Sequence, residues 1–211
     1  MSNHLLIFCK KSGGYNRGMW ERKELKTNLL GTLEMALLMP QGVKRFNNDM
    51  SAMFRSFWLI PIVMPFTLYA IHLMQPSVEQ IASLSYGFVA VMFTFKILVV
   101  TVLTLLLGYG FAKHYERMEH FCLTVTALNW SGLINTLLFL PAVVMVGSGA
   151  YAWDDIYAYL VFLSLYGYLI TGFIMTYSFR IPWELGGCLA ICFMAINQTS
   201  LDIMYWIASM L

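Results

Sequence analysis

The stretch LSYGFVAVMFTFKILVVTVLTLLLGYGFA, residues 84–112, contains one charged side chain, Lys96. A helix needs about 20 predominantly apolar residues to cross the hydrocarbon core of a bilayer. This stretch is longer than that minimum, so it can cross the bilayer with some tilt. It therefore predicts a transmembrane helix, and it indicates that the chain is a membrane protein.

The rest of the chain repeats this pattern. Its hydrophobic residues make up 59% of the sequence and its charged residues only 11%, whereas soluble domains carry roughly 25% charged residues. We therefore expect an all-α fold, a polytopic membrane bundle of five transmembrane helices that occupies residues 56–211. The other four predicted spans are residues 56–74, 121–146, 155–178 and 184–208.

The connecting segments predict the orientation of the bundle. No Lys or Arg lies between the first and second spans or between the third and fourth. Lys113 and Arg117 lie between the second and third spans, and Arg180 lies between the fourth and fifth. Because basic residues are retained on the cytoplasmic side, this alternation predicts a cytoplasmic amino terminus and a carboxyl terminus outside.

The region before the first span is predicted to have two parts. Residues 1–23 are rich in Lys, Gly and Ser, and we expect a flexible basic cytoplasmic tail beside anionic headgroups rather than a nucleic-acid-binding segment. Residues 24–55 are expected to form amphipathic helices. They either lie in the headgroup region or pack beneath the cytoplasmic face of the bundle. The predicted apolar face of the second helix, which runs into the first span, consists of Val43, Phe46, Met50, Met53 and Phe57.

Two charged side chains lie inside predicted spans, Lys96 in the second and Asp202 in the fifth. A charge at the bilayer centre costs at least ~2.5–3.5 kcal/mol, so we expect the two residues to pair. Six residues of the fifth span share one face at helical spacing and are expected to contact other spans: Cys188, Cys192, Ala195, Gln198, Thr199 and Asp202. Asn197 is expected to project away from these six residues, toward another helix or another subunit. The predicted intramembrane polar layer is Lys96, Asn135, Gln198, Thr199 and Asp202.

Two interpretations of this layer stay open. It is a substrate or proton pathway, or its hydrogen bonds hold the helices together. We favour the second interpretation, because five spans show no inverted repeat of the kind that many transporters have.

The sequence shows no catalytic or metal-binding signature. His114, Glu116 and His120 form the one cluster that resembles a ligand set, but a zinc site needs three or four ligands at characteristic spacings. We interpret the cluster as a solvated helix end. We therefore expect no enzymatic activity, no catalytic residue, no metal and no cofactor.

A cytoplasmic amino-terminal segment, five spans and almost no outer tail resemble the Yip family of small membrane proteins. Its bacterial members are the most similar, over the stretch LLLGYGFAKHYERMEHFCLTVTALNWSGLINTLLFLP, residues 105–141. The Asp-Leu-Tyr-Gly-Pro motif of the eukaryotic members is absent, so their role in vesicle traffic is not implied. Phe121, Ala127, Asn129 and Trp130 also look like a stretch of uncharacterised alphaproteobacterial inner-membrane proteins. The resemblance implies a bacterial inner (plasma) membrane location.

The expected function follows from these features. We predict a non-enzymatic integral membrane protein that organises partners or lipid, as a homo-oligomer or as an accessory subunit of a membrane complex. Its expected partners are the lipid bilayer and a protein or second copy, with no nucleic acid. The alternative is a small transporter or channel that uses Lys96 and Asp202.

Overall fold

A computed structural model describes residues 21–210, and within that range the chain is helical with no strand. Five helical segments are long and apolar enough to cross a membrane: Met50–Ser77, Tyr86–His114, Met118–Gly147, Tyr157–Phe179 and Trp183–Ala208. The predicted all-α fold with five spans is confirmed. Residues 1–20 of the predicted tail lie outside the described residues.

The first span is built from two helices, α4 (Met50–Ser56) and α5 (Leu59–Met74). Pro61 causes the break at Phe57 and Trp58. Proline has no N–H to donate, and its ring clashes with the carbonyl of the residue four positions earlier in a helix. The Phe57 carbonyl accepts instead from the Ile60 N–H at 3.1 Å. The chain then continues through short helices η1 (Gln75–Ser77) and α6 (Glu79–Ala82).

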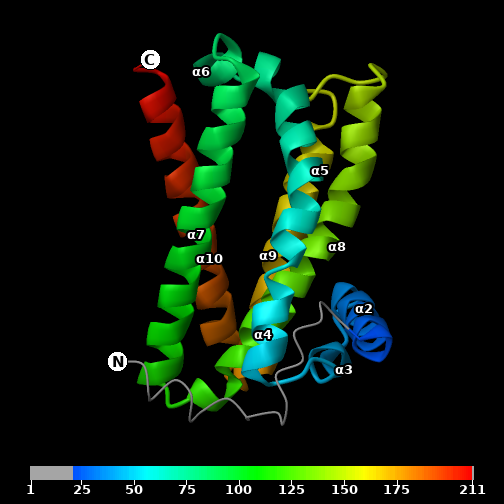
Figure 1. The fold of residues 1–211 in the computed structure, drawn as a ribbon, viewed down its shortest axis with the longest axis vertical. Coiled ribbons are helices and arrows are strands. Elements are labelled where there is room, and N and C mark those ends of the chain that lie inside the picture. The colour runs from blue at the N-terminus through cyan, green and yellow to red at the C-terminus, as the bar shows by residue number, and fades with distance from the viewer. Residues whose placement is uncertain (1–20, 211) are drawn as a thin grey trace.

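The remaining spans are α7 (Tyr86–His114), α8 (Phe121–Gly147), α9 (Tyr157–Phe179) and α10 (Trp183–Ala208), with a short η2 (Met118–His120) before α8. Helix α8 packs against α5 and α9, and α9 packs against α10. Helix α7 contacts α10 far more than it contacts α8, and Figure 1 shows α7 and α10 together on one side of the molecule. Helix α7 is therefore packed loosely against both α5 and α8.

Helices α9 and α10 approach closely at two glycines. A Cβ atom on Gly186 would lie 2.9 Å from the carbonyl oxygen of Gly172 and 2.1 Å from Oγ1 of Thr176. Small residues permit such close approach between membrane helices. This contact fixes which face of α10 turns toward the bundle.

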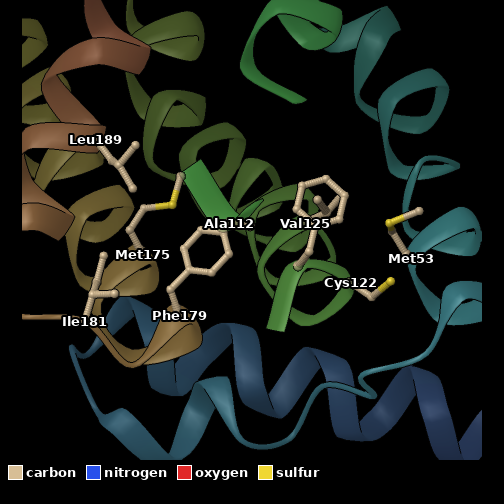
Figure 2. Packing of buried hydrophobic residues seen from close by; sticks show 9 residues of the cluster. Met53, Ala112, Cys122, Val125, Met175, Phe179, Ile181 and Leu189 are labelled. Carbon is tan, nitrogen blue, oxygen red and sulfur yellow. The ribbon is translucent and has the colours of Figure 1, made fainter. Parts of the chain in front are cut away.

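An apolar cluster closes the bundle at the end where α4 begins. Its buried members come from all five spans, and Figure 2 shows how they lie around α8. The labelled residues are Met53, Ala112, Cys122, Val125, Met175, Phe179, Ile181 and Leu189. We call this end the basic end, because every described Lys and Arg except Lys96 lies there. The opposite end, with residues 75–85 and 148–156, is the far end.

Helices α2 (Arg22–Ala36) and α3 (Pro40–Val43) form a collar with α4 on the flank of the basic end (Figure 1). Arg45 donates to both carboxylate oxygens of Glu34, at 2.5 and 2.6 Å. Arg55 donates from Nη2 to Glu24 at 2.7 Å. The hydrogen bond from Arg45 holds the pKa of Glu34 below its ordinary value. Two ion pairs therefore attach α2 to the chain that leads into the first span.

The sequence left two positions open for the apolar residues of this region, one in the lipid headgroup region and one beneath the bundle. Val43, Phe46 and Met53 are buried and Met50 and Phe57 half-buried, all packed against the bundle. Phe46, for example, packs against Trp130 of α8, with ring centroids 6.5 Å apart. These side chains therefore pack against other helices of the bundle.

The same residues do not form one helix, and this corrects the prediction. Val43 ends α3, Phe46 lies in a turn, and α4 starts after Asp49, whose side chain accepts from the Ala52 N–H at 2.6 Å. A hydrogen bond to α8 also stabilises this turn. The Asn48 side chain accepts it from the Leu123 N–H at the start of α8, at 3.0 Å. A carboxylate cap and an amide that binds another helix both favour a break over a continuous helix.

Helix α2 turns its leucines outward. Its buried residues are Asn28, Gly31, Thr32 and Met35, which face the bundle or α3. The outward residues include Leu33 and Leu37, each about 60% exposed. In the described residues no other helix covers this leucine face. It is an exposed apolar surface at the basic end.

Candidate functional site

Four of the spans each place one polar side chain at the same depth in the bundle. They are Lys96 of α7, Asn135 of α8, Tyr168 of α9 and Asn197 of α10. At 1.5 Å per residue, each lies about 15–18 Å from the far end of its own helix. We call this set the inner polar layer.

Lys96 makes the central contact of the layer. Its Nζ donates to Oδ1 of Asn197 at 2.7 Å, which joins α7 to α10. No carboxylate in residues 21–210 lies within ion-pair distance of Lys96. The ammonium therefore has an amide dipole beside it but no counter-charge from the described chain.

The predicted pair between Lys96 and Asp202 is wrong. Asp202 is exposed, and its carboxylate accepts from Nε2 of Gln198 at 3.0 Å. It lies five residues after Asn197, which places it about 7.5 Å further along the axis and on a different face of α10. Asn197 projects away from the predicted face of the fifth span toward another helix, as expected, and it is the residue that meets Lys96.

The remaining predicted residues of the fifth span also face outward. All six are exposed, and no helix among the described residues covers them: Cys188, Cys192, Ala195, Gln198, Thr199 and Asp202. We call them the outer stripe. Gln198, Thr199 and Asp202 therefore do not join the inner layer, whereas Lys96 and Asn135 do.

A cavity of about 300 Å³ lies between α7, α8, α9 and α10, where α7 and α8 are loosely packed. Asn135, Tyr168 and Asn197 line it at the level of the inner layer, and Phe121 and Phe179 line it toward the basic end. A second cavity, of about 170 Å³, lies against α5 and shares Asn129 and Gly132 with the first. The structure thus has a partly open cavity with a polar end and an apolar end.

Most hydroxyl groups in the cavity wall are already used. Thr101, Thr104 and Thr171 each donate to the carbonyl four residues earlier in their own helix, at 2.8–2.9 Å. The side chains of Asn135 and Tyr168, by contrast, have no hydrogen-bond partner in the described chain, and Asn197 uses only its oxygen. The uncommitted donors therefore gather at the polar end, next to Lys96.

Tyr168 was not identified from the sequence, because tyrosine is frequent in its span and was interpreted as a packing residue. A signal was present, since its distance from the far end of its helix equals that of Asn197 and differs from that of Lys96 by about one residue. Comparing polar residues by depth, rather than by face, would have found it.

The cluster of His114, Glu116 and His120 does not assemble in the structure. Within residues 21–210 no group of three or more His, Cys, Asp or Glu side chains is placed to hold a metal ion. Glu116 adopts a positive φ of 57°, which terminates α7, while His120 is buried at the start of α8.

Comparisons with protein families, curated proteins and solved structures find no match to this chain.

Proposed function

We propose that this integral membrane protein is a non-enzymatic assembly component whose outer stripe binds a second copy of the chain. The exposure of Gln198, Thr199 and Asp202 within a span supports this proposal. An amide or carboxylate facing lipid is costly, and such groups are normally directed at protein or water. A partner helix whose Gln198 and Thr199 donate hydrogen bonds to these groups would lower that cost.

The chemistry of the stripe favours a second copy as the partner. In a dimer with its axis along the membrane normal, identical residues of two α10 helices meet at the same depth. Cys188, Cys192 and Ala195 are small enough to let the helices approach closely. Gln198 has both a donor and an acceptor group, so it is complementary to itself.

The orientation of the dimer is part of the proposal. We infer that the basic end faces the cytoplasm of a bacterial cell and that the carboxyl terminus lies outside. The leucine face of α2 then contacts lipid at the inner boundary of the membrane. Alkaline phosphatase fused after Ala150 or Leu211 should be active and after Arg117 inactive. Activity at Arg117 would reverse the orientation.

Cysteine cross-linking in native membranes tests the contact directly. Cys188 and Cys192 are free and exposed on the stripe, so a mild oxidant should produce a disulfide-linked dimer. The background is a variant with the other two cysteines changed to Ala. The dimer band should disappear when Cys188 and Cys192 are also changed to Ala.

The matched control moves the thiol to another exposed position. Leu165 of α9 is 64% exposed and lies away from the stripe. In the cysteine-free variant, Leu165→Cys should give little cross-linking. Equal cross-linking at Leu165 and Cys192 would indicate random collision, and no cross-linking at Cys188 or Cys192 would refute the contact.

A further inference from the structure

We propose that the cavity between α7, α8, α9 and α10 binds a single-chain amphiphile with an anionic oxygen group, such as a carboxylate or phosphate. The anionic group meets Lys96, Asn197, Asn135 and Tyr168, and the chain extends toward Phe121 and Phe179. This binding site does not depend on the proposed contact between two α10 helices.

The charge of the ligand follows from Lys96. Lys96 does not itself line the cavity, but its ammonium donates a hydrogen bond to Asn197, which does. The ammonium has no carboxylate partner in the described chain. A lone positive charge at this depth is costly, and charged residues inside membranes generally pair with an opposite charge or polar group. An anionic ligand would complete that pairing.

The head group is specified by the unused donors. The Asn135 amide, the Tyr168 hydroxyl and the Asn197 amide nitrogen make no hydrogen bond within the described residues, and all three line the polar end. Carboxylate and phosphate oxygens accept several hydrogen bonds each and favour charge-assisted donors such as an ammonium. Three of these donors line the polar end of one cavity, and the fourth, Lys96, is hydrogen-bonded to one of them, Asn197.

The shape of the cavity specifies the body of the ligand. Its lining residues extend along α8 from Phe121 to Asn135, about 21 Å of helix. A volume of about 300 Å³ spread over that length leaves a narrow space. Toward the basic end, apolar side chains such as Phe121, Val125 and Phe179 line most of the cavity wall. An extended alkyl chain fits such a space better than a compact ring system.

Equilibrium binding of three probes with the same chain length tests the proposal. The probes are palmitate, hexadecyl phosphate and uncharged hexadecanol, added to the purified full-length protein in amphipol, with empty amphipol as background. Both anionic probes should bind at least about tenfold more tightly than hexadecanol. Preference for only one of them would show whether the natural ligand is a carboxylate or a phosphate.

Variants then separate the head group from the chain. Lys96→Met should weaken the anionic probes about tenfold or more and leave hexadecanol unchanged, whereas Lys96→Arg should retain most of the binding. Tyr168→Phe removes one hydroxyl only, so it tests the head-group site even if Lys96→Met fails to fold. It should weaken the anionic probes several-fold.

A pair of variants on α7 tests the location. Val100 lines the cavity, while Val102 on the same helix is exposed. Val100→Trp should abolish binding of all three probes, and Val102→Trp should leave binding unchanged. The proposal is overturned if hexadecanol binds as tightly as palmitate, or if both tryptophan variants behave alike. Cross-linking at Cys192 should be unaffected in every case, so failure here leaves the dimer proposal standing.

Discussion

Asn197 and Gln198 are adjacent amides on α10 that have opposite environments. Asn197 faces α7, accepts a hydrogen bond from Lys96 and lines the cavity. Gln198 faces outward, where it donates to Asp202 on the same helix. One residue along a helix is a rotation of about 100°, enough to move a side chain from the interior to the lipid-facing surface. The comparison teaches that polarity in a span does not reveal which contact a residue makes.

We expect the largest difference in stability from substitutions at two adjacent glycines of α10, Gly186 and Gly187. Gly186 faces α9, where an added Cβ would meet the Gly172 carbonyl oxygen at 2.9 Å, while next to Gly187 nothing lies within 4 Å. Gly186→Ala should destabilise the protein by about 3 kcal/mol, since a backbone carbonyl cannot move aside easily. Gly187→Ala should be neutral or slightly stabilising, because Ala favours helix. Unfolding in detergent measures both. Equal effects would mean that α10 is rotated relative to the structure.

The hydrogen bond of Lys96 gives the next largest effect. Asn197→Leu leaves the ammonium without its acceptor and should cost about 2 kcal/mol. Combined with Lys96→Met, the double variant should be more stable than the sum of the single effects predicts, with a coupling of about 0.5–3 kcal/mol.

The matched control pairs Lys96→Met with Asp202→Leu. These residues make no contact with one another, so their effects should add within about 0.5 kcal/mol. Strong coupling between Lys96 and Asp202 would restore the pair expected from the sequence and would contradict the hydrogen bond to Asn197.

The ion pair between Glu34 and Arg45 in the collar should have a smaller effect on stability than the hydrogen bond of Lys96, and its effect should depend on pH. The pKa of Glu34 is lowered in the folded protein, so the ion pair contributes fully above the unfolded pKa of about 4.3 and is lost as the pH falls through the folded value. The protection of the α2 amides, measured as the exchange rate relative to the intrinsic rate at the same pH, should therefore fall as the pH drops through the folded pKa of Glu34, roughly as it does in Glu34→Gln at neutral pH. Exchange in α7 and α10 should not follow this profile. A pH-independent α2 would show that the ion pair does not hold the collar.

The outer stripe should give the smallest effect on the stability of a single chain. Gln198→Leu combined with Asp202→Leu removes two polar groups whose side-chain hydrogen bond in the described chain is with each other. The unfolding free energy in detergent should change by less than about 0.5 kcal/mol, as for most surface substitutions. The oxidised dimer at Cys192 should nevertheless be lost in membranes. A large loss of monomer stability would place the stripe inside the bundle.

The sequence predicted part of the candidate site. Lys96 and Asn135 were identified as members of one polar layer, because a charge and an amide stand out in apolar spans. Asn197 was placed correctly on a different face from the outer stripe but was not identified as the partner of Lys96, and Tyr168 was missed. Only the packing of α7 against α10 shows which amide meets Lys96, since both Asn197 and Gln198 lie within reach in depth.

The region before the first span shows the same division. Its apolar residues at helical spacing were recognised, yet Val43, Phe46 and Met53 pack against the bundle in separate elements, while the leucines of α2 face outward. The crossing of α2 and α3 decides this, because a Cβ on Gly42 would lie 2.7 Å from the Gly31 carbonyl oxygen. A glycine in a sequence does not show which backbone it will meet.

The sequence by itself determined the five spans and the separation of charge between the two ends of the bundle. Both depend only on the residues within each segment. A helix in lipid must form its backbone hydrogen bonds within itself and must be apolar over about 20 residues. Tertiary structure alone decided the rotation of each helix about its own axis. In lipid, apolar side chains are equally stable against tails and against other helices, so hydrophobicity carries no information about which face turns inward. Close contacts such as Gly172 with Gly186 carry that information, and they exist only once the helices have met.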